Sequence, residues 1–333
     1  MAYTTIDDPS AYFKVQLYTG NGSANHAITF DDTDTDMQPD LVWIKNRDTT
    51  DSHCLFDSVR GATKVLHSDA TTAEVTDTDT LDSFASDGFQ VDADVKVNTN
   101  TEDYVAWCWK EASGIMDIVS FTGNGSARTV SHSLSAVPGL IITKNRELGS
   151  SEWPTYHHKN TTAPETERLF LSGTQATLDN ATFWNDTAPT SSVFSVATSV
   201  DNNQDTKDII AYLFAEKQGF SKFGSYTGNG SSTEGAFIYT GFRPAYLVVK
   251  RTDSTNVWSC YDNKRNTFNI MSSEQELDAN KADQANSRFD LLSNGFQNKT
   301  GGSANNTSGG TYVYIAFAEA PLVNSEGVPA TAR

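Results

Sequence analysis

The chain has 333 residues, which allows about two domains of average size, and its formal net charge at pH 7 is −18. Such an excess of acidic side chains repels phosphate, so we expect no binding to nucleic acid. No apolar run approaches the roughly 20 residues that a transmembrane helix needs, so we also expect no insertion into a membrane. Aromatic residues make up 11% of the chain, a share that is too high for a disordered protein.

The N-terminal segment and the cysteines indicate where the chain is made. The first ten residues contain neither the basic nor the apolar region of a secretory signal. The three cysteines, Cys54, Cys108 and Cys260, include no Cys-x-x-Cys pair and are too few to crosslink a chain of this length. We therefore expect synthesis in a reducing cytoplasm, without structural disulfides.

Three sequence markers recur in the same order along the chain. The first, Tyr/Phe-Thr-Gly-Asn-Gly-Ser, has its threonines at Thr19, Thr122 and Thr227, which lie 103 and 105 residues apart. The second is a proline-led apolar stretch that ends in Lys-Asn-Arg or Lys-Arg, and the third is an aromatic stretch that ends in glutamate. Three markers with one spacing indicate three copies of one domain. The second marker begins at Pro39, Pro138 and Pro244, and the third ends at Glu111, Glu216 and Glu319.

The markers set the boundaries of the copies, which we call repeats. We predict repeat 1 at residues 1–113, repeat 2 at 114–219 and repeat 3 at 220–320, followed by an extended C-terminal arm at 321–333. Repeat 1 is strongly acidic, with 7 basic and 21 acidic side chains, whereas the other 220 residues carry 17 and 21. We infer that the repeats keep a common strand framework and differ on their surfaces.

The first two strands expected in each repeat flank the Gly-Asn-Gly segment. In repeat 1 these are a strand at residues 13–18 and another at residues 26–30. Asn-Gly between two strands is a strong signal for a tight hairpin, in which both central residues need a positive φ. The hairpin turns are predicted at Gly20, Asn21 and Gly22, at Gly123, Asn124 and Gly125, and at Gly228, Asn229 and Gly230.

The remaining strands follow in the same order in each repeat. The proline-led strand is apolar on both faces and is expected to be covered on both. A short strand around residues 53–57 comes next, and an aromatic strand closes the unit. Residues 274–286 could form a helix of two or three turns, but their counterparts, 71–82 and 173–187, carry no helical period, so we predict a loop that differs among the repeats.

Six or seven short strands in about 104 residues are typical of a small antiparallel β-sandwich. The sequence therefore predicts an all-β protein of three tandem homologous antiparallel β-sandwich domains, of jelly-roll or lectin-like type. The linkers between repeats are only a few residues long, which favours rigid packing. The three domains either follow one another in a line or surround a pseudo-three-fold axis, as the subunits of a trimer do.

Acidic runs in repeat 1 are one candidate site. Alternating carboxylates can face one side of a loop and bind Ca²⁺, although neither run has the spacing of an EF-hand. The alternative is a solvated acidic loop. With no histidine pair at zinc-binding spacing either, we predict no metal and no cofactor. The runs are Asp31, Asp32, Asp34, Asp36 and Asp40, and Asp77, Asp79 and Asp82.

An aromatic and histidine cluster in repeat 2 is the second candidate site. Trp153, Tyr156, His157 and His158 lie between predicted strands. Exposed side chains of these types can stack on a glycan or contact a partner protein, and the alternative is packing against the neighbouring repeat. No nucleophile motif such as Gly-x-Ser-x-Gly is present, so we expect no enzymatic activity. Paired carboxylates for glycoside cleavage stay open, because only the fold brings such groups together.

Repeat 1 contains the signatures Tyr-Thr-Gly-Asn-Gly, Pro-Asp-Leu-Val-Trp-Ile-Lys-Asn-Arg, Leu-Phe-Asp-Ser-Val-Arg-Gly, Asp-Gly-Phe and Tyr-Val-Ala-Trp-Cys-Trp-Lys-Glu. Together they resemble a domain found in virion and tail-fibre-type proteins of bacteriophages, especially marine ones. The resemblance is close over residues 10–112. It is weaker in repeats 2 and 3, where Arg265 retains part of the third signature.

This resemblance implies a non-enzymatic structural protein on the surface of a phage particle, synthesised in the cytoplasm of the host bacterium. As a capsid decoration or knob, or as a tail accessory protein, it would contact other virion proteins and be oligomeric on the particle. The alternative is a receptor-binding tail-fibre adhesin for a host surface glycan or protein, and a depolymerase is a third. No anchor or shaft precedes repeat 1 in this sequence, which favours the first role, whereas the occurrence of the family in fibres favours the second.

Overall fold

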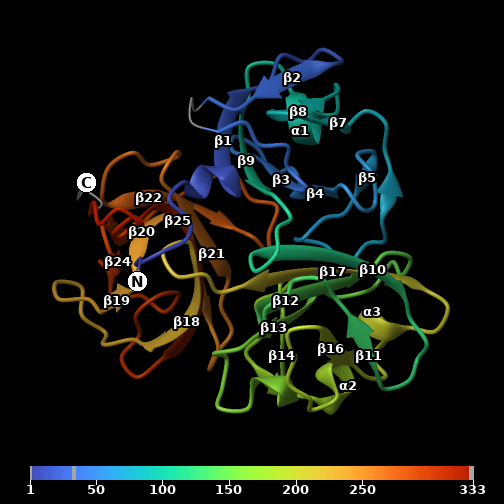
Figure 1. The fold of residues 1–333 in the computed structure, drawn as a ribbon. Helices are drawn as coiled ribbons and strands as arrows, with labels where there is room; N and C mark the ends of the chain where they lie inside the picture. The colour runs from blue at the N-terminus through green and yellow to red at the C-terminus, as the bar shows by residue number, and fades with distance from the viewer. Residues whose placement is uncertain (1, 32–34, 330–333) are drawn as a thin grey trace.

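The computed structural model describes residues 2–31 and 35–329. Strands account for 44% of the chain and helices for 6%, and the strands form several antiparallel sheets (Figure 1). The predicted all-β class is therefore confirmed. No helix within the two described ranges is long and apolar enough to cross a membrane.

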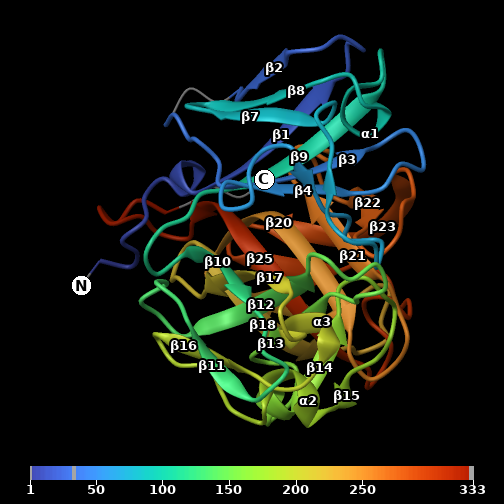
Figure 2. The same cartoon turned by 90° about the vertical axis from the view of Figure 1, so that its right-hand side faces the viewer.

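Repeat 1 forms an inner and an outer sheet, which lie one above the other in Figure 2. Its elements are η1 (Pro9–Ala11), β1 (Phe13–Thr19), β2 (His26–Thr29), β3 (Leu41–Asn46), β4 (Cys54–Asp57), β5 (Lys64–Val65), β6 (Val75–Thr76), β7 (Leu81–Ala85), β8 (Gly88–Val91), α1 (Val95–Asn98) and β9 (Asp103–Trp109). The inner sheet has the strand order β1-β9-β3-β4, and the outer sheet has the order β2-β8-β7.

Repeat 2 places its strands in the same order. Its elements are β10 (Met116–Thr122), β11 (Arg128–Ser131), β12 (Pro138–Asn145), β13 (Pro154–His157), η2 (Pro164–Thr166), β14 (Glu167–Phe170), β15 (Leu178–Asp179), α2 (Ala181–Trp184), β16 (Val193–Val196), α3 (Val200–Asn203) and β17 (Asp208–Ala215). The inner sheet is β10-β17-β12-β13-β14-β15, and the outer pair is β11-β16.

Repeat 3 repeats this order within one continuous sheet. Its elements are β18 (Ser221–Thr227), β19 (Phe237–Tyr239), β20 (Phe242–Arg251), β21 (Trp258–Asp262), β22 (Met271–Glu276), β23 (Gln284–Leu292), β24 (Gly295–Asn298) and β25 (Thr311–Pro321). The strand order is β18-β25-β20-β21-β22-β23-β24-β19. Residues 274–286, predicted as a loop, thus include the end of β22 and the start of β23, and residues 277–283 connect the two strands. Pairing of β22 with β21 overrides their weak local signal.

Within the described residues, four apolar cores hold the sheets together. Each repeat has a core between its inner and outer strands, to which the equivalent residues Phe89, Phe194 and Phe296 contribute. A fourth core, which we call the central core, lies on the other face of the inner sheets and contains side chains of all three repeats. The proline-led strand β3 is buried along its whole length because it contributes to both kinds of core, which confirms the predicted two-sided cover.

Three aromatic rings meet in the central core. Trp109, Phe214 and Phe317 occupy the same position in the three closing strands. Their ring centroids lie 6.1 Å apart for Trp109 and Phe214, 5.7 Å for Trp109 and Phe317, and 5.8 Å for Phe214 and Phe317. Each ring contacts both others, so the repeats surround a common centre and do not form a line, as Figure 1 shows.

The Gly-Asn-Gly segments do not form the predicted tight hairpins. The strand before Gly20 pairs with β9 and the strand after Gly22 pairs with β8, so the segment crosses from the inner to the outer sheet. Of the three residues in each segment, the second glycine alone has a positive φ, which is 65°, 66° and 72° at Gly22, Gly125 and Gly230. The Asn-Gly signal reports a local φ preference and does not determine which strands pair.

A buried asparagine holds each crossing segment in place. The side-chain oxygen of Asn98 accepts a hydrogen bond from the Asn21 backbone at 2.8 Å, and its amide donates to the Ser23 carbonyl at 2.8 Å. Asn203 and Asn306 make the same two contacts in repeats 2 and 3. The sequence alone did not predict these residues as structural contacts, although each stands five positions before its closing strand.

The close approach at this contact makes a testable prediction. A Cβ atom added to Gly20 would lie 2.1 Å from the carbonyl oxygen of Thr99. Gly20→Ala should therefore lower the free energy of unfolding by about 2 kcal/mol or more, measured by urea titration. Gly149, around which nothing lies within 4 Å, is the matched control, and Gly149→Ala should be neutral. Equal stability of the two variants would contradict the contact.

The segment after repeat 3 turns back on the N-terminal segment. Val323 and Pro329 form an antiparallel bridge. The backbone amide of Ser325 donates to Asp7 Oδ1 at 2.7 Å. The described part of the predicted extended arm is thus a turn that ties the two ends of the chain together.

Candidate functional site

The predicted aromatic and histidine cluster lies largely inside the protein. Trp153 is fully buried and its indole Nε1 donates to the carbonyl oxygens of His67 at 3.0 Å and Ala70 at 3.2 Å. Both acceptors belong to repeat 1. Tyr156 points the other way into the core of repeat 2, where its ring lies 5.9 Å from that of Trp184.

The two histidines of this cluster face repeat 3. His157 is buried and its Nε2 donates to the Tyr314 carbonyl at 3.1 Å, while Nε2 of His158 lies 2.7 Å from the Phe223 carbonyl. Burial lowers the pKa of His157 to about 3, so this ring is neutral at physiological pH. The cluster therefore offers no exposed aromatic surface. It lies between the repeats because the neighbouring repeat, not solvent, covers β13.

Trp153 and its equivalents in the other repeats, His53 and Trp258, form hydrogen bonds that join the three repeats in a closed cycle. His53 of repeat 1 donates from Nε2 to the Glu276 carbonyl of repeat 3 at 3.1 Å. Trp153 of repeat 2 donates to the His67 carbonyl of repeat 1 at 3.0 Å. Trp258 of repeat 3 donates from Nε1 to the Phe170 carbonyl of repeat 2 at 2.9 Å. Each repeat is thus bonded to one neighbour through the same position. Repeats 3 and 1 are in contact although they are not adjacent in the chain.

A second cycle contains buried charges. The Asp57 carboxylate in repeat 1 accepts a hydrogen bond from the Tyr212 hydroxyl of repeat 2 at 2.7 Å. The equivalent Asp262 of repeat 3 accepts one from the Trp107 indole of repeat 1 at 3.0 Å. His157 occupies this position in repeat 2 and binds repeat 3, so the cycle is again complete.

An arginine neutralises each of these buried carboxylates. Arg60 forms an ion pair with Asp57, and Arg265 forms one with Asp262 at 2.6 Å. Burial opposes the charge of Arg265, but the carboxylates of Asp262 and Asp283 outweigh it and raise its pKa. Asp283 also binds Arg47 of repeat 1 at 2.9 Å. Buried charges of this kind are tolerated when every one is paired, which makes the junction specific in geometry.

The lysine of the proline-led marker joins neighbouring repeats at two of its three positions, whereas Lys45 donates to the Thr49 carbonyl of its own repeat. Lys45, Lys144 and Lys250 are fully buried, and burial lowers the pKa of each to about 8. Lys144 donates to the Thr71 carbonyl of repeat 1 at 3.0 Å, and Lys250 donates to the Thr174 carbonyl of repeat 2 at 2.9 Å. The recurrence of lysine in an apolar strand was the sequence signal for this role.

The acidic runs give no cation site among the residues that the structure describes, where no group of three or more His, Cys, Asp or Glu side chains could hold a metal. Asp32 and Asp34 lie outside the described residues. Asp31 binds Lys264 of repeat 3 at 3.0 Å, and Asp40 accepts a hydrogen bond from the Glu111 backbone at 2.9 Å. In the second run, Asp77 accepts one from the Asp79 backbone at 3.0 Å.

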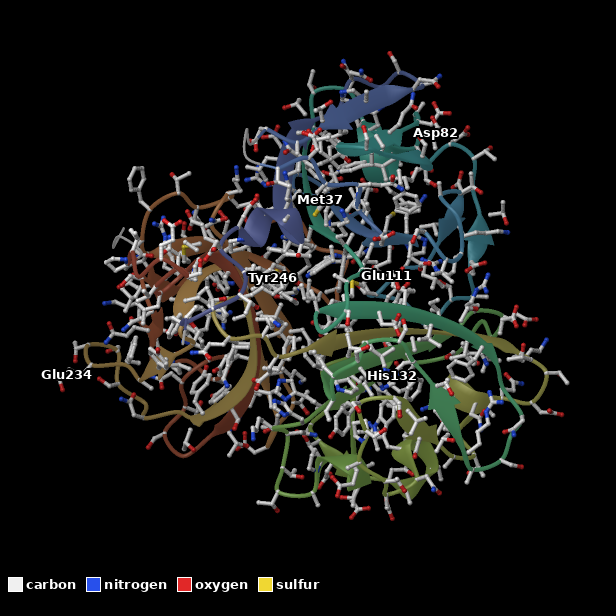
Figure 3. All side chains as sticks on the ribbon, in the orientation of Figure 1. Met37, Asp82, Glu111, His132, Glu234 and Tyr246 are labelled. Carbon is white, nitrogen blue, oxygen red and sulfur yellow. The ribbon has the colours of Figure 1, made fainter. Side chains whose placement is uncertain are left out.

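The junction between repeats 1 and 2 and the junction between repeats 2 and 3 differ in charge. Burial raises the pKa of Glu111 to about 7, and the carboxylates of Asp40 and Asp117 add to this effect. Glu216 is its equivalent at the second junction. Burial raises its pKa too, but hydrogen bonds from His158 and the Phe223 amide and the charge of Lys222 lower it to about 2. Figure 3 shows Glu111 between repeat 1 above and repeat 2 below.

The two glutamates should therefore respond to pH with opposite sign. Folded Glu111 keeps its proton up to about pH 7, whereas the unfolded chain loses it near 4.5, so this stabilisation is present below pH 4.5 and lost as the pH rises through 7. We expect Glu111→Gln to be more stable than the natural chain at pH 8, on the order of 1–2 kcal/mol for a half-buried group. Glu216→Gln should be less stable at pH 8. Urea titrations at pH 4.5 and 8 measure both, and a shared sign would refute the charge difference.

Comparison with known protein families finds a match for this chain. No curated protein and no solved structure matches the chain. A family model described as a domain of unknown function, DUF7483, matches residues 8–321. The match runs from residue 8, just before η1, to the end of β25. The chain belongs to the family of the domain of unknown function DUF7483.

Proposed function

We propose that this protein is a non-enzymatic structural protein on the outer surface of a bacteriophage particle, where it decorates the capsid or accompanies the tail. The observation that carries the proposal is the closed cycle of buried contacts between the repeats. A ring closed in this way has three similar sides around one axis, which fits a position where three identical subunits of a particle meet. The resemblance of residues 10–112 to phage virion proteins supports the same location.

The proposal includes the organisation of the chain. Each repeat is one antiparallel β-sandwich of jelly-roll or lectin-like type, and the three are tandem homologues. In support, the closing strand lies between the first and the proline-led strand in all three repeats, and the second strand pairs with β8, β16 or β24. Three equivalent asparagines hold equivalent crossings, which independent folds would not share.

The contacts that the buried charged side chains make support a structural role. Asp57, Arg60, Asp262 and Arg265 are deeply buried, and each binds protein groups at a junction between repeats. Groups engaged in this way stabilise geometry and are not available to substrates. The partners are other virion proteins, with copies of the chain arranged by the symmetry of the particle.

Location on the particle is the direct test. Purified phage particles should contain the chain in mass spectrometry, and antibody raised against it should place gold on the head or tail of intact virions. Label on the head would assign a decoration or knob protein, and label on the tail would assign an accessory protein. Presence of the chain in infected cells but not in purified particles would overturn the proposal.

A receptor-binding adhesin for a host surface glycan or protein is the second candidate. Two exposed aromatic side chains on β19 favour it, since Phe237 and Tyr239 are about half exposed. Purified protein that binds whole host cells would support this role. A decoration protein should not bind them.

A further inference from the structure

The outer strand of repeat 3 differs from its two counterparts in what it exposes. Ile28, Val130 and Ile238 are equivalent buried residues, because they pair with Phe89, Phe194 and Phe296. The residues on either side of each point outward. These are Ala27 and Thr29 in repeat 1, Thr129 and Ser131 in repeat 2, and Phe237 and Tyr239 in repeat 3.

The two aromatic side chains therefore form a platform that repeats 1 and 2 lack. Phe237 is 48% exposed and Tyr239 is 53% exposed. Residues two apart on a strand lie about 7 Å apart on the same face. The same backbone carries small side chains in the other repeats, so the fold does not need these rings for packing.

An open cleft begins at Tyr239. Its lining includes Tyr3, Glu216, Lys217, Gln218, Lys222 and Tyr239, and we call it the Tyr239 cleft. The Tyr3 hydroxyl donates to the Gly241 carbonyl at 2.7 Å and lies 3.1 Å from the Tyr239 hydroxyl. These contacts bring the N-terminal segment beside β19, where Figure 1 places the N-terminus.

The junction between repeats 1 and 2 offers an internal comparison for this cleft. Ala112 and Lys217 are equivalent, since their amides donate to the carbonyls four residues later, and Ser113 is equivalent to Gln218. Asp117 stands where Lys222 stands, just before the residue whose amide donates to the junction glutamate. The pocket at the first junction is lined by two carboxylates, Glu111 and Asp117, and by no ammonium group among the described residues.

The Tyr239 cleft thus carries a positive charge on a strongly acidic chain. Lys222 pairs with Glu216 at 3.3 Å. No ion pair joins Lys217 to a carboxylate in the part of the chain that the structure describes. Two lysines therefore face one glutamate, which favours an anionic ligand.

We infer that the Tyr239 cleft binds a carboxylate-bearing saccharide. An aromatic ring can pack against the C–H face of a sugar ring and still present a polar hydroxyl, which suits Tyr239, and Phe237 extends this platform to a second sugar. Lys217 and Lys222 bind the carboxylate, and Gln218 and the Tyr3 hydroxyl bind sugar hydroxyls. The inference rests on the second candidate function, the adhesin, and deepens it, because it assigns a ligand class and binding residues to one side of the ring.

The test is binding of the full chain to an array of acidic oligosaccharides (oligogalacturonates, oligoalginates and sialyllactose), each beside its neutral counterpart. Affinities of the ligands found are then measured by calorimetry. Tyr239→Ser introduces the residue of repeat 2 and should weaken binding about tenfold or more. Lys217→Ala introduces the residue of repeat 1 and should weaken binding about fivefold, less so at high salt. Ser131→Ala at the equivalent position of repeat 2 is the control and should bind normally.

Several results would overturn the inference. They are no binding to any acidic saccharide, equal affinity for the neutral forms, or a Tyr239→Ser protein that melts and binds like the natural chain. Cell binding that is lost after protease treatment but survives periodate oxidation of glycans would point to a protein ligand and also count against it. None of these results depends on whether virions carry the chain, so failure here and failure of the proposed location are distinguishable.

Discussion

Phe317→Ala is expected to lower the free energy of unfolding by about 3–5 kcal/mol, as removal of a large buried ring does. Phe317 contacts Trp109 and Phe214 in the central core, and its ring also lies 5.2 Å from that of Phe13. Because these contacts come from three repeats, the loss should destabilise all of them together. Urea titration followed by tryptophan fluorescence and by circular dichroism should show one transition at a lower midpoint by both probes.

The control for this variant is Phe268→Ala. Phe268 is 80% exposed, so its truncation should change stability by less than about 0.5 kcal/mol. Separate transitions by the two probes in the natural chain would mean that the repeats unfold independently, which contradicts a shared central core. A cost below about 1 kcal/mol for Phe317→Ala would contradict it as well.

Asp262→Asn should destabilise the protein by about 3–5 kcal/mol, because it leaves a buried guanidinium without its closest negative charge. The Asp262 carboxylate binds Arg265 within repeat 3 and the Trp107 indole of repeat 1. Its removal should therefore also open the junction between repeats 3 and 1. Hydrogen exchange at β9 and β21 should increase more than exchange at β16, which lies in repeat 2.

Asp253→Asn is the matched control for the loss of a carboxylate. Asp253 pairs with Arg251 at 2.8 Å, but its side chain is 38% exposed, so this pair should contribute no more than about 1 kcal/mol. If the two variants cost the same in urea titrations, the buried pair does not stabilise the junction.

Local chemistry made much of the strand framework predictable. The first strand, the proline-led strand and the closing strand of each repeat lie where the sequence markers predict them, because apolar runs bounded by turn residues specify strands through nearby residues alone. The short strand predicted around residues 53–57 is β4. β22 and β23 were missed, because residues such as Glu274 and Asn286 have low strand propensity and form strands only through pairing.

The candidate site in repeat 2 shows where sequence reasoning stops. Trp153 and His157 occur in a polar context that is compatible with an exposed patch or with an interface. Their acceptors, the His67 and Tyr314 carbonyls, are 86 and 157 residues away in the chain. Burial of a side chain depends on what covers it, and here the cover comes from the neighbouring repeats.

The two aromatic side chains on β19 show the opposite case, because they are exposed where the sequence suggests burial. Phe237 and Tyr239 look like ordinary strand residues, and aromatic residues in strands are usually buried. Their exposure follows from register, since the pairing of Ile238 with Phe296 places Ile238 toward the core and both neighbours toward solvent. Comparison of this strand with β2 and β11 is possible only when the pairing is known.

The sequence by itself determined the all-β class and the positions of the first, proline-led and closing strands, because turn chemistry and apolar alternation act over short distances. The tertiary structure alone decided which strands pair across the Gly-Asn-Gly segments, which charges are buried, and that Trp109, Phe214 and Phe317 meet at one centre. The three rings lie 103 to 208 positions apart in the chain, and such contacts form only when three inner sheets bury their second apolar face against one another.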